Sequence, residues 1–394
     1  MDSRRLQREL TNVLPILRGL LADATDDPDR PYRPVILRVS TTQAGLELAA
    51  SSSTTKGSRR PAGLKRTNAE PLCLRLPSVR LPAEQQRAQF EKAISQYRSQ
   101  YGRKPEMVCL RDAGVVEIAY ESAGVVQPLE NKIAVVTGAA GAIGYGVCKV
   151  LLENGCFVAA TDLPGRRLKQ FVDDLKAAGH DRVWGVGLDV TRRVSVTAAF
   201  EKVIRTWGGV DIVVVNAGIA LVSRLKQIDL EAFRRLERVN VEGTLLTLQE
   251  AATHLMAQGT GGDIVVMSTK NVPCPGAGFG AYSATKAACH QLGRIASVEL
   301  AEYGVRVNMV APDAVFSEGP YKSGLWQEVG PDRMRARGLD EKGLQQYYQN
   351  RNLLKARVTG RHVGNAVLFF VTRQTPTTGA TIPVDGGLPD ATPR

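Results

Sequence analysis

Apolar residues in the first third of the chain follow two different periods. Two stretches carry them three or four positions apart, which predicts amphipathic helices over residues 1–22 and 84–101. Pro15 should kink or break the first of these helices. Three short apolar runs predict strands over residues 34–40, 107–110 and 115–119. We therefore expect a small α/β region in residues 1–128.

From residue 131 onward, short apolar runs alternate with stretches of helical periodicity. The apolar runs predict strands over residues 132–137, 156–161, 183–188, 212–215, 264–267, 305–310 and 381–384. This alternation predicts a doubly wound parallel sheet with helices on both faces. Ligands of such sheets bind beyond the carboxyl ends of the strands. Small or polar residues follow most of the strand ends, namely Asp189, Asn216, Ser268 and Pro312.

The connection between the first two of these strands has the order of a dinucleotide-binding site. A strand ends at Thr137, a glycine-rich turn runs from Gly138 to Gly144, a helix follows over residues 145–153, and the next strand ends beside Asp162. The glycines permit a tight turn, so that a pyrophosphate can lie at the helix N-terminus. Asp162 would accept hydrogen bonds from the adenosine ribose and repel a 2′-phosphate, which favours NAD over NADP.

Two observations leave alternatives open at this turn. Arg166 and Arg167 lie close enough to Asp162 in sequence to weaken the preference for NAD. A glycine-rich turn also occurs at any sharp connection from a strand to a helix. The complete order of strand, turn, helix, strand and acid is what favours a nucleotide site.

Tyr282 and Lys286 are the strongest candidates for catalytic chemistry. They are four residues apart at the start of a helix predicted over residues 283–300, so they share one face. A nearby positive charge favours the phenolate form of a tyrosine, which makes it a usable general acid or base. Taken alone, this spacing also fits a solvated helix face.

Several motifs then follow one another in a fixed order. They are Thr137-Gly-Ala-Ala-Gly-Ala-Ile-Gly144, Asp189-Val190, Asn216-Ala-Gly218, Asn240, Tyr282-Ser-Ala-Thr-Lys286 and Thr378-Gly-Ala-Thr-Ile-Pro-Val-Asp-Gly-Gly387. In this order they resemble the short-chain dehydrogenase/reductase family over residues 129–387. The resemblance implies an α/β fold with a Rossmann-type doubly wound parallel sheet in residues 129–394, beside the small N-terminal α/β region.

The resemblance also implies roles for single residues. Tyr282 is the acid/base, Lys286 binds the nicotinamide ribose and lowers the pKa of Tyr282, and Asn240 supports a water in the proton relay. The implied cofactor-binding residues are Gly138, Gly141, Ala142, Ile143, Gly144, Asp162, Asp189, Val190, Asn216, Ala217, Gly218, Tyr282, Lys286, Val315 and Ser317.

The chain departs from the family pattern at three positions. Ala142 stands at the middle glycine of the fingerprint, and its methyl group is expected to crowd the cofactor slightly. Thr269 stands where the substrate-polarising serine usually lies, and its hydroxyl can donate the same hydrogen bond. The adjacent Ser268 should face the other side of the strand. Asp313 replaces the usual glycine after Pro312.

A narrower resemblance concerns both ends of the chain. Pro312-Asp-Ala-Val-Phe316 and the Pro393-Arg394 ending resemble the dehydrogenase half of bifunctional rhamnulose-1-phosphate aldolase/alcohol dehydrogenases. Residues 1–128 then correspond to a truncated aldolase-like remnant. No histidine occurs in residues 1–179, so we expect neither a metal site nor lyase activity there.

The composition of the chain limits the kinds of binding partner and the cellular location that we expect. The net charge of the 394-residue chain is +12, and the local basic cluster comprises Lys56, Arg59, Arg60, Lys65 and Arg66. Without interleaved aromatic residues this cluster favours a flexible surface loop over nucleic-acid binding. Six scattered cysteines and the lack of an apolar leader or membrane span predict a cytoplasmic protein. The family resemblance implies a homo-oligomer, a dimer or tetramer.

The leading hypothesis is an NAD-dependent oxidoreductase that interconverts an alcohol and its carbonyl compound, on a sugar, polyol or small hydroxyaldehyde. Residues 316–356 are expected to form a lid, whose Lys322, Arg333, Arg335 and Arg337 either bind a phosphate or carboxylate or form a solvated helix face. The alternatives are a dinucleotide-binding redox sensor or scaffold without turnover, which Thr269 and Asp313 favour, and residual aldolase activity.

Overall fold

The computed structural model describes residues 3–27, 31–42, 46, 49, 72–75, 82–111, 113–120, 127–317, 321, 323, 326–327 and 329–389. The chain forms two compact units. Unit 1 comprises Met1–Val126, Phe200–Val210 and Thr253–Gly261, and unit 2 comprises Gln127–Ala199, Asp211–Ala252 and Gly262–Arg394. Unit 1 is therefore discontinuous in sequence, whereas the sequence predicts a division at one point, between residues 128 and 129.

Unit 2 is built on a seven-stranded sheet in the order β13-β12-β11-β10-β7-β8-β9, with every neighbouring pair parallel. The strands are β7 (Ile133–Thr137), β8 (Phe157–Asp162), β9 (Val183–Gly187), β10 (Ile212–Val215), β11 (Gly262–Met267), β12 (Val305–Pro312) and β13 (Thr381–Val384). Every residue of β7, β10 and β11 is buried, as expected for a sheet covered on both faces. The predicted doubly wound sheet is confirmed.

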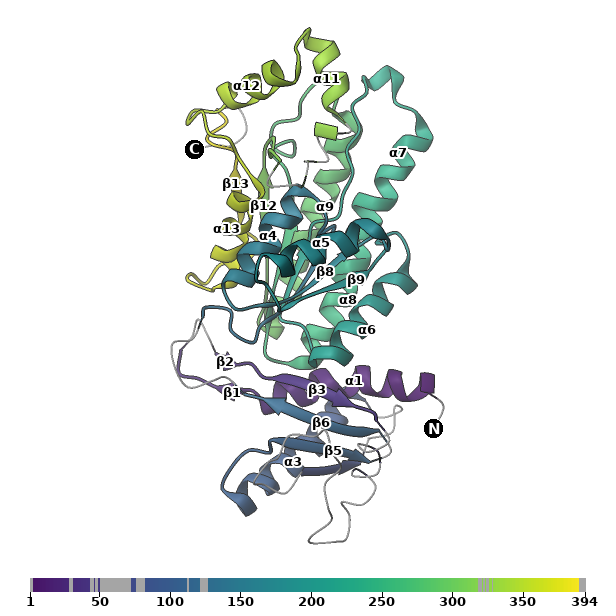
Figure 1. Cartoon of the computed structure of the whole chain (residues 1–394), viewed down its shortest axis with the longest axis vertical. Helices are drawn as coiled ribbons and strands as arrows, with labels where there is room; N and C mark the ends of the chain where they lie inside the picture. The colour runs from purple at the N-terminus through teal and green to yellow at the C-terminus, as the bar shows by residue number, and fades with distance from the viewer. Residues whose placement is uncertain are drawn as a thin grey trace. The chain divides into compact units, whose positions relative to one another are not determined.

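Helices cover both faces of this sheet (Figure 1). The helices described from residue 142 to residue 371 are α4 (Ala142–Glu153), α5 (Arg166–Ala177), α6 (Arg193–Trp207), α7 (Leu230–Leu236), α8 (Gly243–Gln258), α9 (Gly280–Glu299), α11 (Gly330–Arg337), α12 (Glu341–Arg351) and α13 (Gly360–Val371), with a π-helical segment at Glu237–Glu242. Of these, α11 and α12 lie beyond the strand ends rather than on a face of the sheet (Figure 1). Alternate strand residues, such as Val136 and Val214, pack with apolar residues of α4, α5 and α13 in one core. α9 packs against β11 and β12.

Glycines allow α4 and α13 to cross at a very short distance. A Cβ atom on Gly146 would lie 2.0 Å from the carbonyl carbon of Gly360, and one on Gly364 would lie 2.7 Å from the Gly146 oxygen. Only residues without side chains fit this crossing. The crossing holds α4 in place, and its first turn follows the glycine-rich turn that begins at Gly138.

The segment expected to form a lid contains α11 and α12, and its residue Tyr321 packs against α4 and α5. The Tyr321 hydroxyl donates to Asp174 Oδ2 at 2.6 Å, and its ring stacks on Tyr145 with 4.8 Å between the ring centroids. Further along, Phe316, Leu344 and Tyr348 form a small apolar cluster of their own. The described residues of this segment thus include two helices and packed aromatic side chains.

The described residues of unit 1 include the helices α1 (Ser3–Leu21) and α3 (Ala83–Tyr101) and a four-stranded sheet. Its strands are β3 (Ile36–Ser40), β4 (Leu72–Arg75), β5 (Met107–Arg111) and β6 (Gly114–Ala119) in the order β3-β6-β5-β4. Two short strands, β1 (Asp23–Ala24) and β2 (Tyr32–Arg33), pair separately. α1 continues through Pro15, so of the predicted kink or break the break is wrong. Burial of its apolar face, including Leu14 and Leu17, outweighs the backbone hydrogen bond that proline cannot make.

A buried guanidinium connects α1 with the end of α8, which belongs to unit 1. Arg18 is 1% exposed, and it donates through Nε to the Val35 oxygen at 2.7 Å and through Nη1 to Gln258 Oε1 at 3.0 Å. Arg87 donates to the Gln258 backbone oxygen at 2.7 Å. A Cβ atom on Gly19 would lie 1.9 Å from that same oxygen. The end of α8 is therefore an integral part of unit 1.

Several sequence-based expectations fall outside the described residues, including the basic cluster from Lys56 to Arg66 and the lid residue Lys322. No helix in the described part of the chain is both long enough and apolar enough to cross a membrane. Within the same residues, His, Cys, Asp and Glu side chains do not gather in a group of three or more that could hold a metal ion.

Candidate active site

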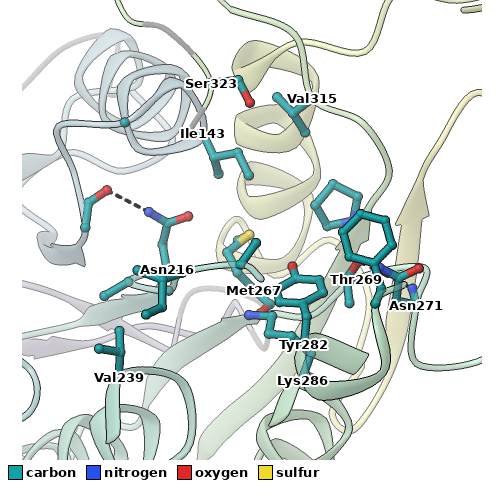
Figure 2. Close-up of a pocket in the computed structure, with 18 of the residues that line it drawn as sticks. Ile143, Asn216, Val239, Met267, Thr269, Asn271, Tyr282, Lys286, Val315 and Ser323 are labelled. Carbon is teal, nitrogen blue, oxygen red and sulfur yellow. Dashed lines mark hydrogen bonds between the residues drawn. The ribbon is translucent and has the colours of Figure 1, made fainter. Parts of the chain in front are cut away.

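A cavity of about 1420 Å³ lies at the carboxyl ends of the strands of unit 2. Its lining includes residues that end or follow five neighbouring strands: Gly138, Asp162, Asp189, Asn216 and Thr269. Further lining residues come from α9, from the segment after β12, and from α11 and α12. Figure 2 shows Ile143, Asn216, Met267, Tyr282 and Lys286 grouped around this cavity.

The glycine-rich turn is held in place by the loop that follows β10. Gly138 has φ +61°, and a Cβ atom on it would lie 2.8 Å from Ala217 Cα, so glycine is required there. Asn216 Nδ2 donates to the oxygens of Thr137 and Gly138 at 3.0 and 2.9 Å. Thr137 Oγ1 accepts from the backbone N–H groups of Asn216 and Ala217.

The first turn of α4 meets the cavity next to this turn. Gly141 is its N-cap, and no side chain caps the helix there. Gly141, Ala142, Ile143 and Gly144 all line the cavity. A Cβ atom on Gly141 would approach only the Gly138 oxygen, at 3.9 Å, so space remains beside the turn for a ligand. Uncapped N–H groups beside open space suit the pyrophosphate of a dinucleotide.

Asp162, at the end of β8, supports this turn and also lines the cavity. Its Oδ2 accepts from Ala140 N at 2.9 Å and its Oδ1 from Leu163 N at 2.8 Å. Arg167 donates to the Ala140 oxygen at 2.8 Å, so its guanidinium is held at the same end of the cavity. Arg166 is exposed and does not belong to the lining.

α9 presents Tyr282 and Lys286 one turn apart, and both line the cavity (Figure 2). Thr269, at the end of β11, hydrogen-bonds to the Tyr282 side chain. Burial raises the pKa of Tyr282 to about 12, and the bond from Thr269 opposes this rise. Tyr282 is therefore a protonated phenol at neutral pH in the structure.

Lys286 is held by the backbone of β11. Its side chain is 7% exposed, its Nζ donates to the Met267 oxygen, and burial lowers its pKa. Burial raises the pKa of Tyr282 in the structure, so the lowering of that pKa by Lys286 stays a prediction. The sequence shows that the two side chains share a helix face, but it does not show how deeply they lie.

Asn240 holds two elements together from behind the cavity wall. It lies in the π-helical segment, is 1% exposed, and is not a lining residue. Its Oδ1 accepts from Ile219 N at 2.9 Å, and its Nδ2 donates to the Ile219 oxygen and to Thr285 Oγ1, both at 3.0 Å. Asn240 thus ties the loop after β10 to α9, beside Gly218.

The remaining predicted residues fall into three groups. Asp189, Val190, Ala217, Gly218 and Val315 line the cavity. Ser317 does not line the cavity, whereas Ser323 does. The Oγ atom of Ser317 accepts a hydrogen bond from Ser323 N at 3.1 Å. Ser268 pairs with His290 Nδ1 at 2.9 Å, while the neighbouring Thr269 hydrogen-bonds to Tyr282.

Sequence reasoning missed three cavity residues near Thr269. Lys270 and Asn271 follow it directly, and Arg351 ends α12 and forms an ion pair with Asp313. The departure at Asp313 therefore has a structural partner. Lys270 and Asn271 could have been predicted as cavity residues because they directly follow Thr269. Arg351 could not, because it lies 38 residues away in sequence from its partner Asp313.

Comparisons with known proteins agree with this architecture. The family model for short chain dehydrogenases matches residues 132–326. The cis-4-hydroxycyclohexanecarboxylate dehydrogenase of Sinomonas cyclohexanicum is 36% identical over 50% of this chain and 78% of its own length. The sorbitol dehydrogenase of Cereibacter sphaeroides is 32% identical over 48% of this chain and 73% of its own. The chain therefore belongs to the short-chain dehydrogenase/reductase family, whose members are NAD(P)-dependent oxidoreductases acting on alcohol and carbonyl groups.

Two further matches show the extent of the similarity. The uncharacterized oxidoreductase YuxG of Bacillus subtilis is 34% identical over 67% of this chain, and the match spans 38% of its own length. The crystal structure of the sorbitol-6-phosphate 2-dehydrogenase SrlD from Erwinia amylovora aligns with a TM-score of 0.59 and 27% identity, covering 64% of this chain and 98% of the other. The predicted family and its Rossmann-type sheet are confirmed.

Proposed function

We propose that this protein is an NAD-dependent oxidoreductase that interconverts an alcohol and its carbonyl compound, with a sugar, polyol or small hydroxyaldehyde as substrate. The observation that carries the proposal is the position of Tyr282. Its hydroxyl is hydrogen-bonded to Thr269 and lines the same cavity as the glycine-rich turn at Gly138. The names of two relatives, a sorbitol dehydrogenase and a cis-4-hydroxycyclohexanecarboxylate dehydrogenase, support a hydroxyl-bearing substrate.

Different residues of the cavity lining would bind the cofactor and carry out the chemistry. The turn at Gly138, the first turn of α4 and Asp162 would hold the adenosine diphosphate part of the cofactor, and Lys286 its nicotinamide ribose. When bound, the nicotinamide would accept or deliver a hydride. Tyr282 would take the hydroxyl proton during oxidation and return it during reduction, while Thr269 holds the substrate oxygen. The lid, residues 316–356, would exclude water from this space.

The proposal is tested by titrating the purified chain with NADH and NADPH and then following reduced-nicotinamide absorbance with a panel of polyols and hydroxyaldehydes. Turnover with NAD supports it. Tight NADH binding without turnover on any compound would instead favour a redox sensor or scaffold. Absence of nucleotide binding would overturn both functions.

Replacing Thr269 by valine is expected to lower turnover by about 10²–10³-fold, because one hydrogen-bond donor to the reacting oxygen is lost. Thr269→Ser keeps the hydroxyl and should retain most of the activity. The measurement is kcat for oxidation of one alcohol by each variant. Full activity of Thr269→Val would show that another group holds the substrate oxygen.

Asp162→Asn is expected to shift the ratio of the NADPH and NADH dissociation constants by about tenfold or more towards NADPH, because a negative charge that repels the 2′-phosphate is removed. Asparagine keeps an oxygen that can accept from Ala140 N, so the turn should persist. Fluorescence titration of both reduced cofactors measures the ratio, with Asp181→Asn, at an exposed position, as control. An unchanged ratio would assign the preference to other residues, Arg167 first.

Finer features of the sequence-based hypothesis remain proposals. Neither the relatives nor the solved structures named above support the resemblance to bifunctional rhamnulose-1-phosphate aldolase/alcohol dehydrogenases or an aldolase-like origin of residues 1–128. The proposal that the protein forms a homo-oligomer is based on the family resemblance alone. A cytoplasmic location is supported by the thiols of Cys148, Cys274 and Cys289, which form no disulfides.

A further inference from the structure

Basic side chains gather at the part of the cavity near Thr269. Lys270 follows β11, Arg333 and Arg337 lie in α11, and Arg351 ends α12; all four line the cavity. Asp313 is the carboxylate that lines this part, and it forms an ion pair with Arg351. Within the described residues, positive charge therefore exceeds negative charge here.

Arg333 is the most exceptional of these groups. Its guanidinium stacks on the Phe279 ring, 4.3 Å from the ring centroid, and its Nε is buried without a hydrogen-bond partner in the described part of the chain. No acceptor among the described residues bonds the rest of its guanidinium. Burial lowers the pKa of Arg333, and the positive charges of Arg337 and Arg351 act in the same direction. A half-buried cation with a buried, unpaired Nε favours a partner that the described residues do not supply.

Lys270 has a backbone partner but forms no ion pair with a described residue. Its Nζ donates to the backbone oxygen of Cys274 at 3.3 Å. Burial lowers its pKa, Asp313 opposes this effect, and the positive charges of Arg351 and Arg333 add to it. Because Arg351 already pairs with Asp313, Arg333 and Lys270 are left facing the cavity without an anion among the described residues.

The distance between Arg333 and the phenol of Tyr282 determines the length of substrate that could contact both. The Phe279 ring that carries the Arg333 guanidinium lies 6.1 Å from the Tyr282 ring, centroid to centroid. One aromatic ring thus separates the cation from the phenol. A substrate of a few carbons spans this gap, with its reacting carbinol at Tyr282 and a terminal group at Arg333.

Asn271 supplies a further polar group in the part of the cavity near Thr269. It is 6% exposed, lines the cavity, and its Oδ1 is buried without a hydrogen-bond partner in the described residues. Figure 2 shows Asn271 beyond Thr269, on the side away from Lys286. An orphaned acceptor at this place suits a hydroxyl of the substrate.

We propose that the substrate carries an anionic terminal group, a carboxylate or a phosphate monoester, which Arg333 and Lys270 bind while Asn271 accepts a hydrogen bond from an intervening hydroxyl. This inference rests on the proposed function and specifies its substrate class. The anionic group would be unchanged in the reaction: the carbinol C–H bond would give up a hydride to a bound oxidised nicotinamide, the hydroxyl proton would pass to the deprotonated form of Tyr282, and a carbonyl group would form. Guanidinium and ammonium groups are the donors that carboxylates and phosphates prefer.

The test compares sorbitol, gluconate and sorbitol 6-phosphate, which share one polyol backbone and differ in terminal charge. The variants are Arg333→Met and Arg333→Lys. Arg335→Met is the matched control, since Arg335 lies on the same helix, is exposed, pairs with Asp332 and does not line the cavity. We expect kcat/KM to favour an anionic member, and to fall about tenfold to a hundredfold for that member in Arg333→Met, mainly through KM. The uncharged member and NADH binding should be unaffected, and Arg333→Lys should restore part of the loss.

The outcomes separate this inference from the proposed function. Equal use of charged and uncharged members, or an equal loss on both in Arg333→Met, overturns the anionic subsite but leaves the oxidoreductase in place. A preference for gluconate alone or for the phosphate alone identifies which anion the site accepts. If no member turns over, the proposed function fails on this panel, and calorimetric binding of gluconate and sorbitol 6-phosphate in the presence of NADH decides the subsite. Binding that Arg333→Met abolishes supports it, and absence of binding overturns it.

Discussion

Tyr282→Phe is expected to lower turnover by about 10²–10⁴-fold while NADH binding is retained, because the variant loses only the hydroxyl that exchanges a proton with the substrate. The ring that packs near Phe279 stays in place, so the cavity should keep its shape. The measurement is kcat for oxidation of one alcohol, with NADH affinity determined by fluorescence titration on the same preparation. Tyr303→Phe is the matched control, because Tyr303 is 40% exposed and does not line the cavity.

The pKa of Tyr282 gives this experiment a second readout. Since burial raises that pKa to about 12, the phenol is protonated at neutral pH and is ready to act as an acid in carbonyl reduction. Alcohol oxidation requires the deprotonated form, so its rate should rise with pH from neutrality towards about 12. Tyr282→Phe should lose this rise. A variant that kept both activity and pH dependence would exclude Tyr282 as the proton-transferring group.

Asp263→Ala is expected to lower the free energy of unfolding of unit 2 by about 3–5 kcal/mol, because it leaves buried charges without their partner. Asp263 is 4% exposed in β11. Its Oδ1 accepts from Arg306 Nε and Nη2 at 2.9 and 2.7 Å, and its Oδ2 from Arg373 Nε at 3.0 Å. One carboxylate therefore neutralises two guanidinium groups at the amino ends of the strands, far from the cavity lining.

A urea titration measures this loss, with a shift of the midpoint at an unchanged slope as the expected form. Asp173→Ala is the control, since Asp173 is exposed on α5 and its removal should change stability by no more than about 0.5 kcal/mol. A loss below about 1 kcal/mol for Asp263→Ala would mean that water or local rearrangement satisfies both arginines.

The fold of unit 2 was predictable because its signals are local. Each strand of the sheet is a short apolar run. Such runs are sufficient to predict the strands of a parallel sheet that is buried on both faces. The glycine at position 138 is required by a positive φ, and the spacing of Tyr282 and Lys286 follows from the period of the helix. Such features can be predicted from the sequence because each depends on only a few neighbouring residues.

The electrostatic properties of the site were not predictable in the same way. The sequence places a lysine one turn from Tyr282 and suggests a lowered phenol pKa, but burial decides the direction, and burial is a property of the whole fold. The two interpretations of the lid arginines also needed the structure. Arg333 and Arg337 line the cavity, whereas Arg335, between them on the same helix, is exposed and pairs with Asp332.

The discontinuity of unit 1 limits how this chain can be cut or recombined. A fragment ending at Val126 would lack the turns of α6 and α8 that complete unit 1, and the buried Arg18 would lose Gln258 as an acceptor. A fragment beginning at Gln127 would keep the sheet and the cavity, but the Gln258 backbone oxygen would lose the donor Arg87. A gene fusion or truncation at that point therefore divides a folded body.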